Sequence, residues 1–419
     1  MWFALRRTET AAPRGGIPSC HALRTSTTHL MLRGIILEQA DQTRTIWAQW
    51  DELAALTGRP YCSPAWMMSW WQHAAPPGAL LRIMPVFEGE DLVGIAPLFA
   101  DRGFAGVSRY RLLAAGTSAP LDILARPGME RTVCPLIARS LAQAEPAPDV
   151  IMLEGLPGDS PWARLLCDVW PGRGTLKLRR QFSQAEPFVK LSGSTYDEWF
   201  ASKPSTYRRY LRRDLRAMNE HGATLRVSRS PEELTRDLKA LAELHHARWR
   251  KRGGSGVLDT RVEHMLAEAG GHLFRQGRFR LFSVELDGRT ISAALFVAAG
   301  GEAAYWLGGF DERETRVRHP GIMTLRYALE QSFSTGDRGL SLGPGGQRYK
   351  HELTSAARSV EWVLLIPSGL RSFLARAQLA PLRTRIVLAQ RVSPEAKRVV
   401  RRLLEWRPTR RSRTGDAAD

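Results

Sequence analysis

Apolar residues in the second half of the chain fall into three short runs of strand type, at 279–286, 290–299 and 303–309. The runs are separated by the pairs Asp287-Gly288 and Gly300-Gly301. Two-residue turns of this composition are typical of β-hairpins, because glycine and aspartate accept the backbone angles that such turns require. The pattern therefore predicts a three-stranded antiparallel meander.

The spacing of apolar residues becomes helical directly after this meander. The predicted helix opens at His319-Pro320-Gly321 and closes at Gly336, so proline and glycine stand at the helix ends that favour them. Strands at 339–343 and 360–366 follow. The first turn of a helix presents free backbone N–H groups and the positive end of the helix dipole. The pattern therefore predicts an anion site just before this helix, although the same residues would also make an ordinary helix start.

The first half of the chain repeats this order of elements. The order strand–strand–strand–helix–strand–helix–strand occurs twice, which predicts an old duplication with domains at 33–191 and 192–368. The first-half elements are expected at 43–56 and 64–73 (helices, the second with the tryptophan-rich run WMMSWW as a core anchor), 81–87, 92–99, 109–114 and 121–125 (strands), 129–143 (helix), 149–154 (strand), 162–169 (helix) and 187–191 (strand).

Composition limits the class of protein. Of 419 residues, 43% are hydrophobic and 24% charged, which is typical of a soluble globular chain. The four cysteines form no CxxC pair, so we expect no metal site and no disulfide framework, and a reducing cytoplasmic setting. No run of about 18 apolar residues could span a membrane. The net charge of +18 favours phosphate-bearing or other anionic partners, or reflects a genomic preference for arginine.

The two ends of the chain are expected to lie outside the two domains. Residues 1–32 are expected to be a disordered leader or a mis-assigned start, with Met31 as the true first residue. Residues 369–419 form a basic tail whose apolar positions suggest short amphipathic helices. Such helices would either lie on an anionic membrane surface, at its inner face, or pack back on the domain before them.

Several segments of the second half resemble one family of enzymes. The order of elements and the segment RVRHPGIM resemble the GNAT acetyltransferase fold. LHHARWRKRGG, LDGRTISAAL, YWLGGFD and GPGGQRYKHEL resemble the CelD-like acetyltransferases of bacterial exopolysaccharide and cellulose synthesis, which are related to the Fem aminoacyltransferases. The GNAT cofactor motif is matched at Arg318 and Gly321 and departs at Met323, where a small residue is usual. The resemblance implies tandem GNAT-like domains, each an α/β (α+β) unit with a mixed, mostly antiparallel central sheet flanked by helices.

The resemblance implies acetyl-CoA, or another acyl-CoA, as the donor, with no metal. The pyrophosphate would lie on the backbone from Arg318 through His319 and Gly321 to Ile322, with Arg316 and Arg318 reaching the phosphates. Tyr349, by its place after the strand at 339–343, would protonate the departing thiolate, unless it only packs.

Acyl transfer also needs a base for the attacking group. In the helix that starts at Ser230, helical spacing puts His245 and Arg248 on the apolar stripe. An imidazole titrates near neutral pH, so His245 is the first candidate base, with a buried structural histidine as the alternative. Asp311, at the end of the meander, is the second candidate.

Cationic residues are candidates for contacts with the acceptor. The segment TYRRYLRRDLRAM carries Arg208 and Arg212 among five arginines, and a helix would gather most of them into one ridge. A solvated face is the alternative, and no nucleic-acid motif is present. Arg248, the adjacent Trp249 and Lys350 complete the set of expected substrate-binding residues.

Taken together, the sequence predicts a tandem GNAT-like acyltransferase that transfers an acyl group directly to an amine or hydroxyl acceptor in polysaccharide or cell-envelope synthesis. The acceptor is expected to be a small molecule or a glycan or lipid-linked molecule. Two alternatives remain, a Fem-like transferase that uses aminoacyl-tRNA and a non-catalytic scaffold at the membrane surface.

Overall fold

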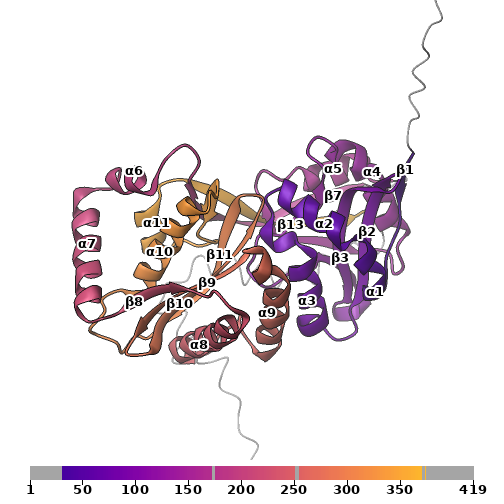
Figure 1. Ribbon diagram of the computed structural model, residues 1–419. Helices are drawn as coiled ribbons and strands as arrows, with labels where there is room; N and C mark the ends of the chain where they lie inside the picture. The colour runs from indigo at the N-terminus through magenta and orange to yellow at the C-terminus, as the bar shows by residue number, and fades with distance from the viewer. Residues whose placement is uncertain (1–30, 172–174, 251–253, 370–372, 374–419) are drawn as a thin grey trace, which may run out of the picture. The chain divides into compact units, whose positions relative to one another are not determined.

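The computed structural model describes residues 31–171, 175–250, 254–369 and 373 (Figure 1). The folded unit begins at Leu32. Nearly all of the expected leader and of the basic tail therefore lies outside the described residues. None of the described helices has the length and apolar character needed to cross a bilayer.

The described strands form one mixed, mostly antiparallel sheet. In sheet order the strands are β1, β2, β3, β4, β6, β13, β7, β12, β11, β10, β9 and β8, and β5 pairs with β3. Their bounds are β1 Leu32–Gly34, β2 Leu80–Glu88, β3 Asp91–Arg102, β4 Ser108–Leu112, β5 Leu124–Ala125, β6 Val150–Pro157, β7 Leu176–Lys190, β8 Thr224–Val227, β9 Phe279–Leu286, β10 Arg289–Ala299, β11 Glu302–Phe310, β12 Gly339–Ser341 and β13 Ala357–Pro367.

Helices flank this sheet, as the predicted fold class requires (Figure 1). Their bounds are α1 Ala40–Thr43, α2 Trp47–Leu56, α3 Pro64–Ala74, α4 Glu130–Gln143, α5 Trp162–Val169, α6 Tyr196–Ala201, α7 Ser205–Glu220, α8 Pro231–Arg250, α9 Thr260–Leu273, α10 Pro320–Ser334 and α11 Arg348–Leu353. The expectation of a mixed α/β fold with a largely antiparallel sheet is confirmed.

The two halves repeat one topology but exchange their last strands. In each half three antiparallel strands precede a parallel partner, β4 beside β6 in the first and β11 beside β12 in the second. The strand that ends the first half, β7, then pairs with β12, whereas β13 pairs with β6. The two exchanged strands also pair with each other along the length of β13. The boundary expected at Leu191 thus follows a strand that both halves share.

The exchanged strand β7 is longer than the sequence pattern indicated. The prediction placed a strand only at 187–191, whereas β7 begins at Leu176. Most side chains before Glu186 are exposed or half-buried, so this stretch has no apolar run to mark it as a strand.

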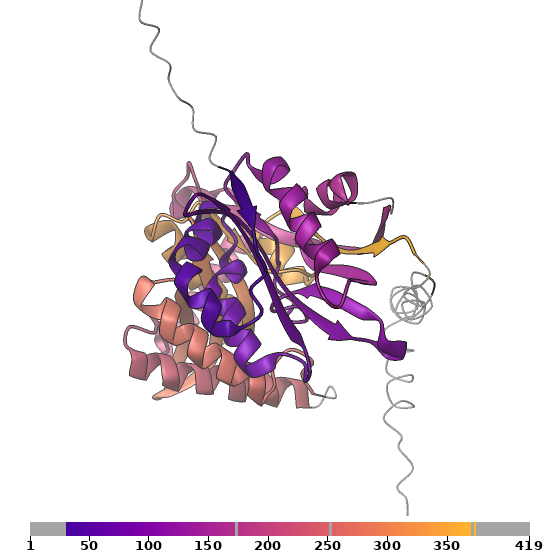
Figure 2. The same ribbon diagram turned by 90° about the vertical axis from the view of Figure 1, so that its right-hand side faces the viewer.

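Tryptophan side chains anchor the contact between the halves. Trp66 in α3 is fully buried and lies edge-on to Trp306 of β11, with ring centroids 5.5 Å apart. Helix α3 also packs against α9 of the second half (Figures 1 and 2). The expectation that the WMMSWW run is a core anchor is confirmed for Trp66 and Trp70, which are 0% and 5% exposed.

A bulge in β11 sets the shape of the second half. Leu295 pairs with Leu307 and Phe296 pairs with Tyr305, so Trp306 is an extra residue in β11. A bulge of this kind bends a strand and changes the direction of its side chains. Pairing between β11 and β12 ends at Ala304. Beyond the bulge, the end of β11 forms one wall of a cleft.

Candidate active site

A cleft of about 560 Å³ lies between the end of β11 and the start of α10. Its walls come from β10, β11, the loop that follows β11, the first turns of α10, and two side chains from α8 and α11. Four of the predicted residues line it, namely Arg248, Asp311, Arg318 and Tyr349. The predicted cradle residues His319, Gly321 and Ile322 also line it.

The cradle is a strained turn at the start of α10. His319 occupies the N-cap in the left-handed region, with φ 52° and ψ 50°, and Pro320 takes the first helical position. A β-carbon at Gly321 would lie 3.1 Å from the Phe310 ring, so glycine allows the helix start to approach the end of β11. Pro320 has no N–H, and the amides of Ile322 and Met323 donate to the His319 carbonyl oxygen. The turn therefore offers an anion the Gly321 N–H and the positive end of the helix dipole.

A buried carboxylate from α7 holds this turn. Nδ1 of His319 lies 2.9 Å from Oδ2 of Asp214, which is fully buried. Asp214 also accepts hydrogen bonds from the guanidinium of Arg213, and the Tyr210 ring lies edge-on to the His319 imidazole. These contacts stabilise the left-handed backbone conformation of His319, which costs a non-glycine residue about 1–3 kcal/mol.

Two tyrosines lie side by side in the wall of the cleft. The Tyr305 hydroxyl donates a hydrogen bond to the Tyr349 oxygen, which raises the pKa of Tyr305 and opposes the rise in the pKa of Tyr349. Burial is the larger effect on both groups and raises the pKa of each. The nearby Arg248 cation partly offsets that rise. The proton of Tyr349 is therefore retained at neutral pH and is not used in the bond to Tyr305.

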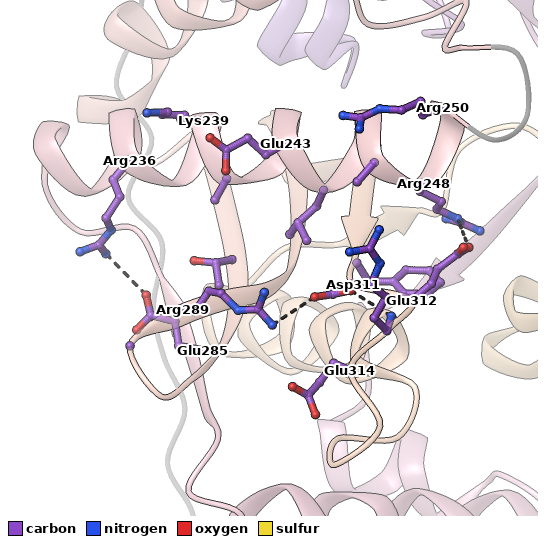
Figure 3. Close-up of a pocket in the computed structure, with 17 residues that line it drawn as sticks. Arg236, Lys239, Glu243, Arg248, Arg250, Glu285, Arg289, Asp311, Glu312 and Glu314 are labelled. Carbon is purple, nitrogen blue, oxygen red and sulfur yellow. Dashed lines mark hydrogen bonds and ion pairs between the residues drawn. The ribbon is translucent and has the colours of Figure 1, made fainter.

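Ion pairs separate the cleft from a neighbouring pocket along α8. The guanidinium of Arg248 stacks on Phe310 at 4.5 Å and its Nε lies 3.5 Å from Glu312. Asp311 pairs with Arg289 at 3.1 Å. Figure 3 shows these two pairs in the pocket of about 930 Å³ that shares Arg248, Asp311 and Glu312 with the cleft. The predicted base Asp311 thus lies in the cleft wall with a cation beside it.

His245, the first candidate base, is not among the residues that line the cleft. Its side chain is only 3% exposed. Nε2 lies 2.8 Å from the Ser255 hydroxyl, and Nδ1 lies 3.4 Å from the Gly308 carbonyl oxygen. Burial lowers the pKa of His245. The imidazole therefore lies between α8 and β11, behind the cleft wall.

Arg316 and Lys350 also lie outside the lining of the cleft. Arg316 forms ion pairs with Glu314 and Asp287, at 3.0 and 2.7 Å. Lys350 is 3% exposed, and its Nζ donates to the carbonyl oxygens of Gly343 and Pro344. Both cations are held by groups of the protein, Arg316 by carboxylates and Lys350 by the glycine-rich loop.

The remaining predicted substrate contacts are also displaced from the cleft. Arg208 donates to the Ala201 carbonyl oxygen at 2.9 Å, and Arg212 stacks over Phe200 at 5.2 Å. Trp249 lies in α8 with its ring 6.0 Å from that of His245. None of these three side chains lines the cleft. The expected ridge on α7 does exist, and its members Arg209, Arg212, Arg213 and Arg216 are exposed.

Met323, where the sequence departs from the family motif, points into the core. Its side chain is fully buried in the cluster that covers the α10 face of the sheet. It does not line the cleft. The larger residue at this position therefore fills the core and leaves the cradle open.

Sequence reasoning missed Tyr305 and the glycine pair Gly308-Gly309. A β-carbon at Gly309 would lie 2.7 Å from the backbone nitrogen of His245, so glycine here lets α8 lie directly on β11. A β-carbon at Gly308 would lie 2.6 Å from the Tyr305 hydroxyl. Two adjacent glycines inside a predicted strand were the available signal, because they indicate a close backbone approach. In the part of the chain that the structure describes, no group of three His, Cys, Asp or Glu side chains could hold a metal ion.

Residues 205–351 match the model of an acetyltransferase (GNAT) domain. The match runs from the start of α7 into α11 and includes all the residues that line the cleft. The second half of the chain is therefore similar to a GNAT-type acetyltransferase domain over these residues. No curated protein sequence matches the chain.

Among the solved structures similar to this chain, FemX shares the fold across both halves. FemX is 12% identical with a TM-score of 0.55, over 82% of this chain and 99% of that chain. L-PGS from Bacillus licheniformis is 13% identical with a TM-score of 0.49, over 84% and 96%. A tandem GNAT protein from the clavulanic acid biosynthesis pathway is 16% identical with a TM-score of 0.39, over 80% and 98%. At these identities the likeness to FemX concerns the fold alone, and the CelD-like assignment stays a prediction.

Proposed function

We propose that this chain, which matches a GNAT-type domain over residues 205–351, transfers an acetyl or other acyl group from a coenzyme A thioester to an amine or hydroxyl acceptor. One observation carries the proposal. The cleft combines the start of α10, which suits a phosphate, with a tyrosine hydroxyl whose proton is available, and both lie within the matched domain. These are the two groups that a thioester donor needs at its two ends.

Among the described residues, the cleft offers the donor one unpaired cation and an apolar surface. Arg318 lines the cleft, is exposed and forms no ion pair with any described residue, so its guanidinium is available to a phosphate. The side chains of Val317, Ile322 and Leu325 add an apolar surface for the arm that joins the phosphates to the sulfur. Arg318 and the α10 backbone would therefore hold the pyrophosphate, without the contribution that we expected from Arg316.

Tyr349 is the proposed proton donor for the departing thiolate. Its pKa is raised mainly by burial, so the phenol is protonated at neutral pH. Because Tyr305 donates to its oxygen, the Tyr349 proton can point into the cleft. General acids of this type contribute about 10²–10⁴-fold to a rate.

Asp311 is the better placed of the two bases that the sequence suggested. It lies in the cleft wall, whereas His245 lies behind it. The Asp311 carboxylate pairs with Arg289 and accepts a hydrogen bond from the Arg313 N–H, and it would have to exchange one of these contacts to act on the acceptor. Asp311 could take a proton from the attacking group directly or hold an ammonium while the proton leaves. The resemblance to CelD-like enzymes supports a role in bacterial polysaccharide or cell-envelope synthesis, with the enzyme in the cytoplasm or at the inner face of the membrane.

Transfer from aminoacyl-tRNA is the second candidate. The exposed arginine ridge on α7 favours it, because four cations on one helix face attract a polyanion. A non-catalytic scaffold is consistent with a departure from the cofactor motif at Met323. That side chain is buried in the core and does not line the cleft, so it gives the scaffold no support.

Thermal unfolding with added acetyl-CoA, coenzyme A or bulk tRNA separates these functions. We expect both coenzymes to raise the unfolding temperature and tRNA to leave it unchanged. Replacement of Arg318 with methionine should remove most of the shift, whereas Arg316→Met, the matched control outside the cleft, should keep it. An absence of response to either coenzyme at millimolar concentration would sink the acyl-CoA proposal, and a response to tRNA alone would favour the second candidate.

A further inference from the structure

A second pocket, here called the junction pocket, reaches the sheet from the first half of the chain. Its volume is about 280 Å³. Arg59 and Tyr61 come from the segment before α3, Glu186 from β7, Ser341 from β12 and Arg358 from β13. The pocket thus exists only because the exchanged strands bring the two halves together.

The junction pocket and the cleft lie on opposite faces of β11. Successive side chains of a strand point to opposite faces, and Ala304 lines the junction pocket whereas Tyr305 lines the cleft. Accordingly, Ala304 belongs to the core cluster on the first-half side and Tyr305 packs on the cluster beneath α10. The last pair between β11 and β12 is Ala304 with Ser341. The two pockets therefore approach each other where these strands stop pairing.

The arginines of the junction pocket are already neutralised by carboxylates. Arg59 pairs with Asp122 and Asp159, at 3.3 and 3.1 Å. Arg358 pairs with Glu302 at 3.2 Å. No cation is left over in this pocket to bind an anionic ligand.

Glu186 differs from the other carboxylates here, because no cation forms an ion pair with it among the described residues. It is 6% exposed, and the Ser341 hydroxyl, 2.6 Å away, is the one hydrogen-bond donor to its side chain in the described part of the chain. Arg358, Arg59 and Lys350 act on this carboxylate only from a distance, through their charge. A buried carboxylate with no cation in direct contact attracts a positively charged donor that can reach it. Burial raises the pKa of Glu186, and the Ser341 hydrogen bond and the charges of the three nearby cations oppose that rise only in part. The net rise brings this carboxylate closer to the range of a general base.

We propose that the junction pocket binds the acceptor of the transfer reaction, and that this acceptor presents a primary amine to Glu186. The reaction in this inference rests on the proposed function. The binding of the amine does not depend on it. The pocket volume is that of about nine water molecules at about 30 Å³ each, which fits one small polar group such as a single sugar ring. A larger acceptor would extend outward past the exposed residues Asp159 and Arg358.

With the amine at Glu186 and the thioester in the cleft, the bonds and protons of the transfer can be followed. The amine arrives as an ammonium and gives one proton to Glu186. Its nitrogen then attacks the thioester carbon from the junction side, so that a C–N bond forms and the C–S bond breaks. The thiolate leaves with a proton from Tyr349 on the cleft side. The second proton that the nitrogen loses returns to the Tyr349 phenolate, and Glu186 releases its proton to solvent before the next turnover.

Calorimetric titration of the full chain with glucosamine tests this site, with glucose as the matched probe that lacks the amine. We expect glucosamine to bind the wild type and to bind Glu186→Gln at least tenfold more weakly, since glutamine keeps a hydrogen bond to Ser341 but loses the charge. Glucose should bind the wild type at least tenfold more weakly than glucosamine. Ser359→Trp, which places a bulky ring at the exposed side of the pocket, should also abolish binding.

Acetyl-CoA titrations of the same variants keep this proposal separate from the proposed function. Glu186→Gln should bind acetyl-CoA within twofold of the wild type, because the donor cleft lies on the other face. The junction site is refuted if the wild type does not bind glucosamine at millimolar concentration, or if Glu186→Gln or Ser359→Trp binds it as the wild type does. Equal binding of glucose refutes the role of the amine. Glucosamine binding without acetyl-CoA binding would support the site and overturn the proposed donor.

Discussion

Replacing Asp214 with alanine should loosen the turn that begins α10. The carboxylate of Asp214 is fully buried and bonds to the imidazole of His319, whose backbone is in the left-handed region. Nothing else on α7 bonds to this imidazole among the described residues. Without the carboxylate, His319 has less to offset the cost of its backbone conformation.

The size of the effect follows from the interaction that is lost. A hydrogen bond to a charged group contributes about 1.5–3 kcal/mol. Local opening of the turn should therefore become about 10- to 150-fold more frequent, since each 1.4 kcal/mol is a factor of about ten. The amides of Ile322 and Met323 report on this opening, because both donate to the His319 carbonyl oxygen.

Amide hydrogen exchange of the ligand-free protein measures this change. We expect faster exchange at Ile322 and Met323 in Asp214→Ala, and no change in the distant strand β3. The decisive comparison uses His319→Gly, because glycine adopts a positive φ without strain. In that background the same Asp214→Ala change should alter exchange by less than about threefold. Equal acceleration in both backgrounds would show that Asp214 does not act through His319, and our account of the turn would be wrong.

Three further outcomes are expected. Tyr349→Phe should lower the turnover number by about 10²-fold or more without weakening acetyl-CoA binding, and an unchanged turnover number would exclude the proton-donor role. Burial lowers the pKa of Lys350 to about 8, so above pH 8 the unfolded state binds more protons than the folded one and stability should rise with pH. Urea unfolding at pH 7, 8, 9 and 10 should show this rise in the wild type relative to Lys350→Met, and parallel curves would contradict it. Gly309→Ala should cost about 1–3 kcal/mol in urea unfolding because its β-carbon would strike the α8 backbone, whereas the control Gly271→Ala in α9, with open space around it, should not destabilise the protein. Equal effects of the two glycine changes would show that the contact does not matter.

The part of the fold that depends on local pattern was predictable. The meander and the helix at 320–334 follow from turn residues, alternation and end signals that lie within a few positions of each other. The exchange of β7 and β13 was not predictable in this way. It depends on pairing between strands that are far apart in the sequence, and the exposed first part of β7 carries no apolar signal.

The candidate site likewise contains residues that local sequence signals could identify and residues that they could not. The cradle residues could be found because a helix start is a local signal. Glu186 could not, because it precedes Pro187 in a polar stretch, and only its pairing with β13 and the hydroxyl of Ser341 bury it. His245 shows the opposite error. Helical spacing correctly predicted that it points inward, but spacing alone does not indicate whether an inward side chain meets a cleft or a strand.

The exchange of final strands also determines when the protein can finish folding as it is made. The edge of β6 has no antiparallel partner until β13 has left the ribosome, although β6 itself ends at Pro157. At about 5–20 residues per second, that interval lasts roughly 10–40 s. An unpaired strand edge is a template for pairing with other chains. The nascent first half should therefore need protection until β13 has been made, and we expect a stop codon placed just before β13 to leave an aggregation-prone protein.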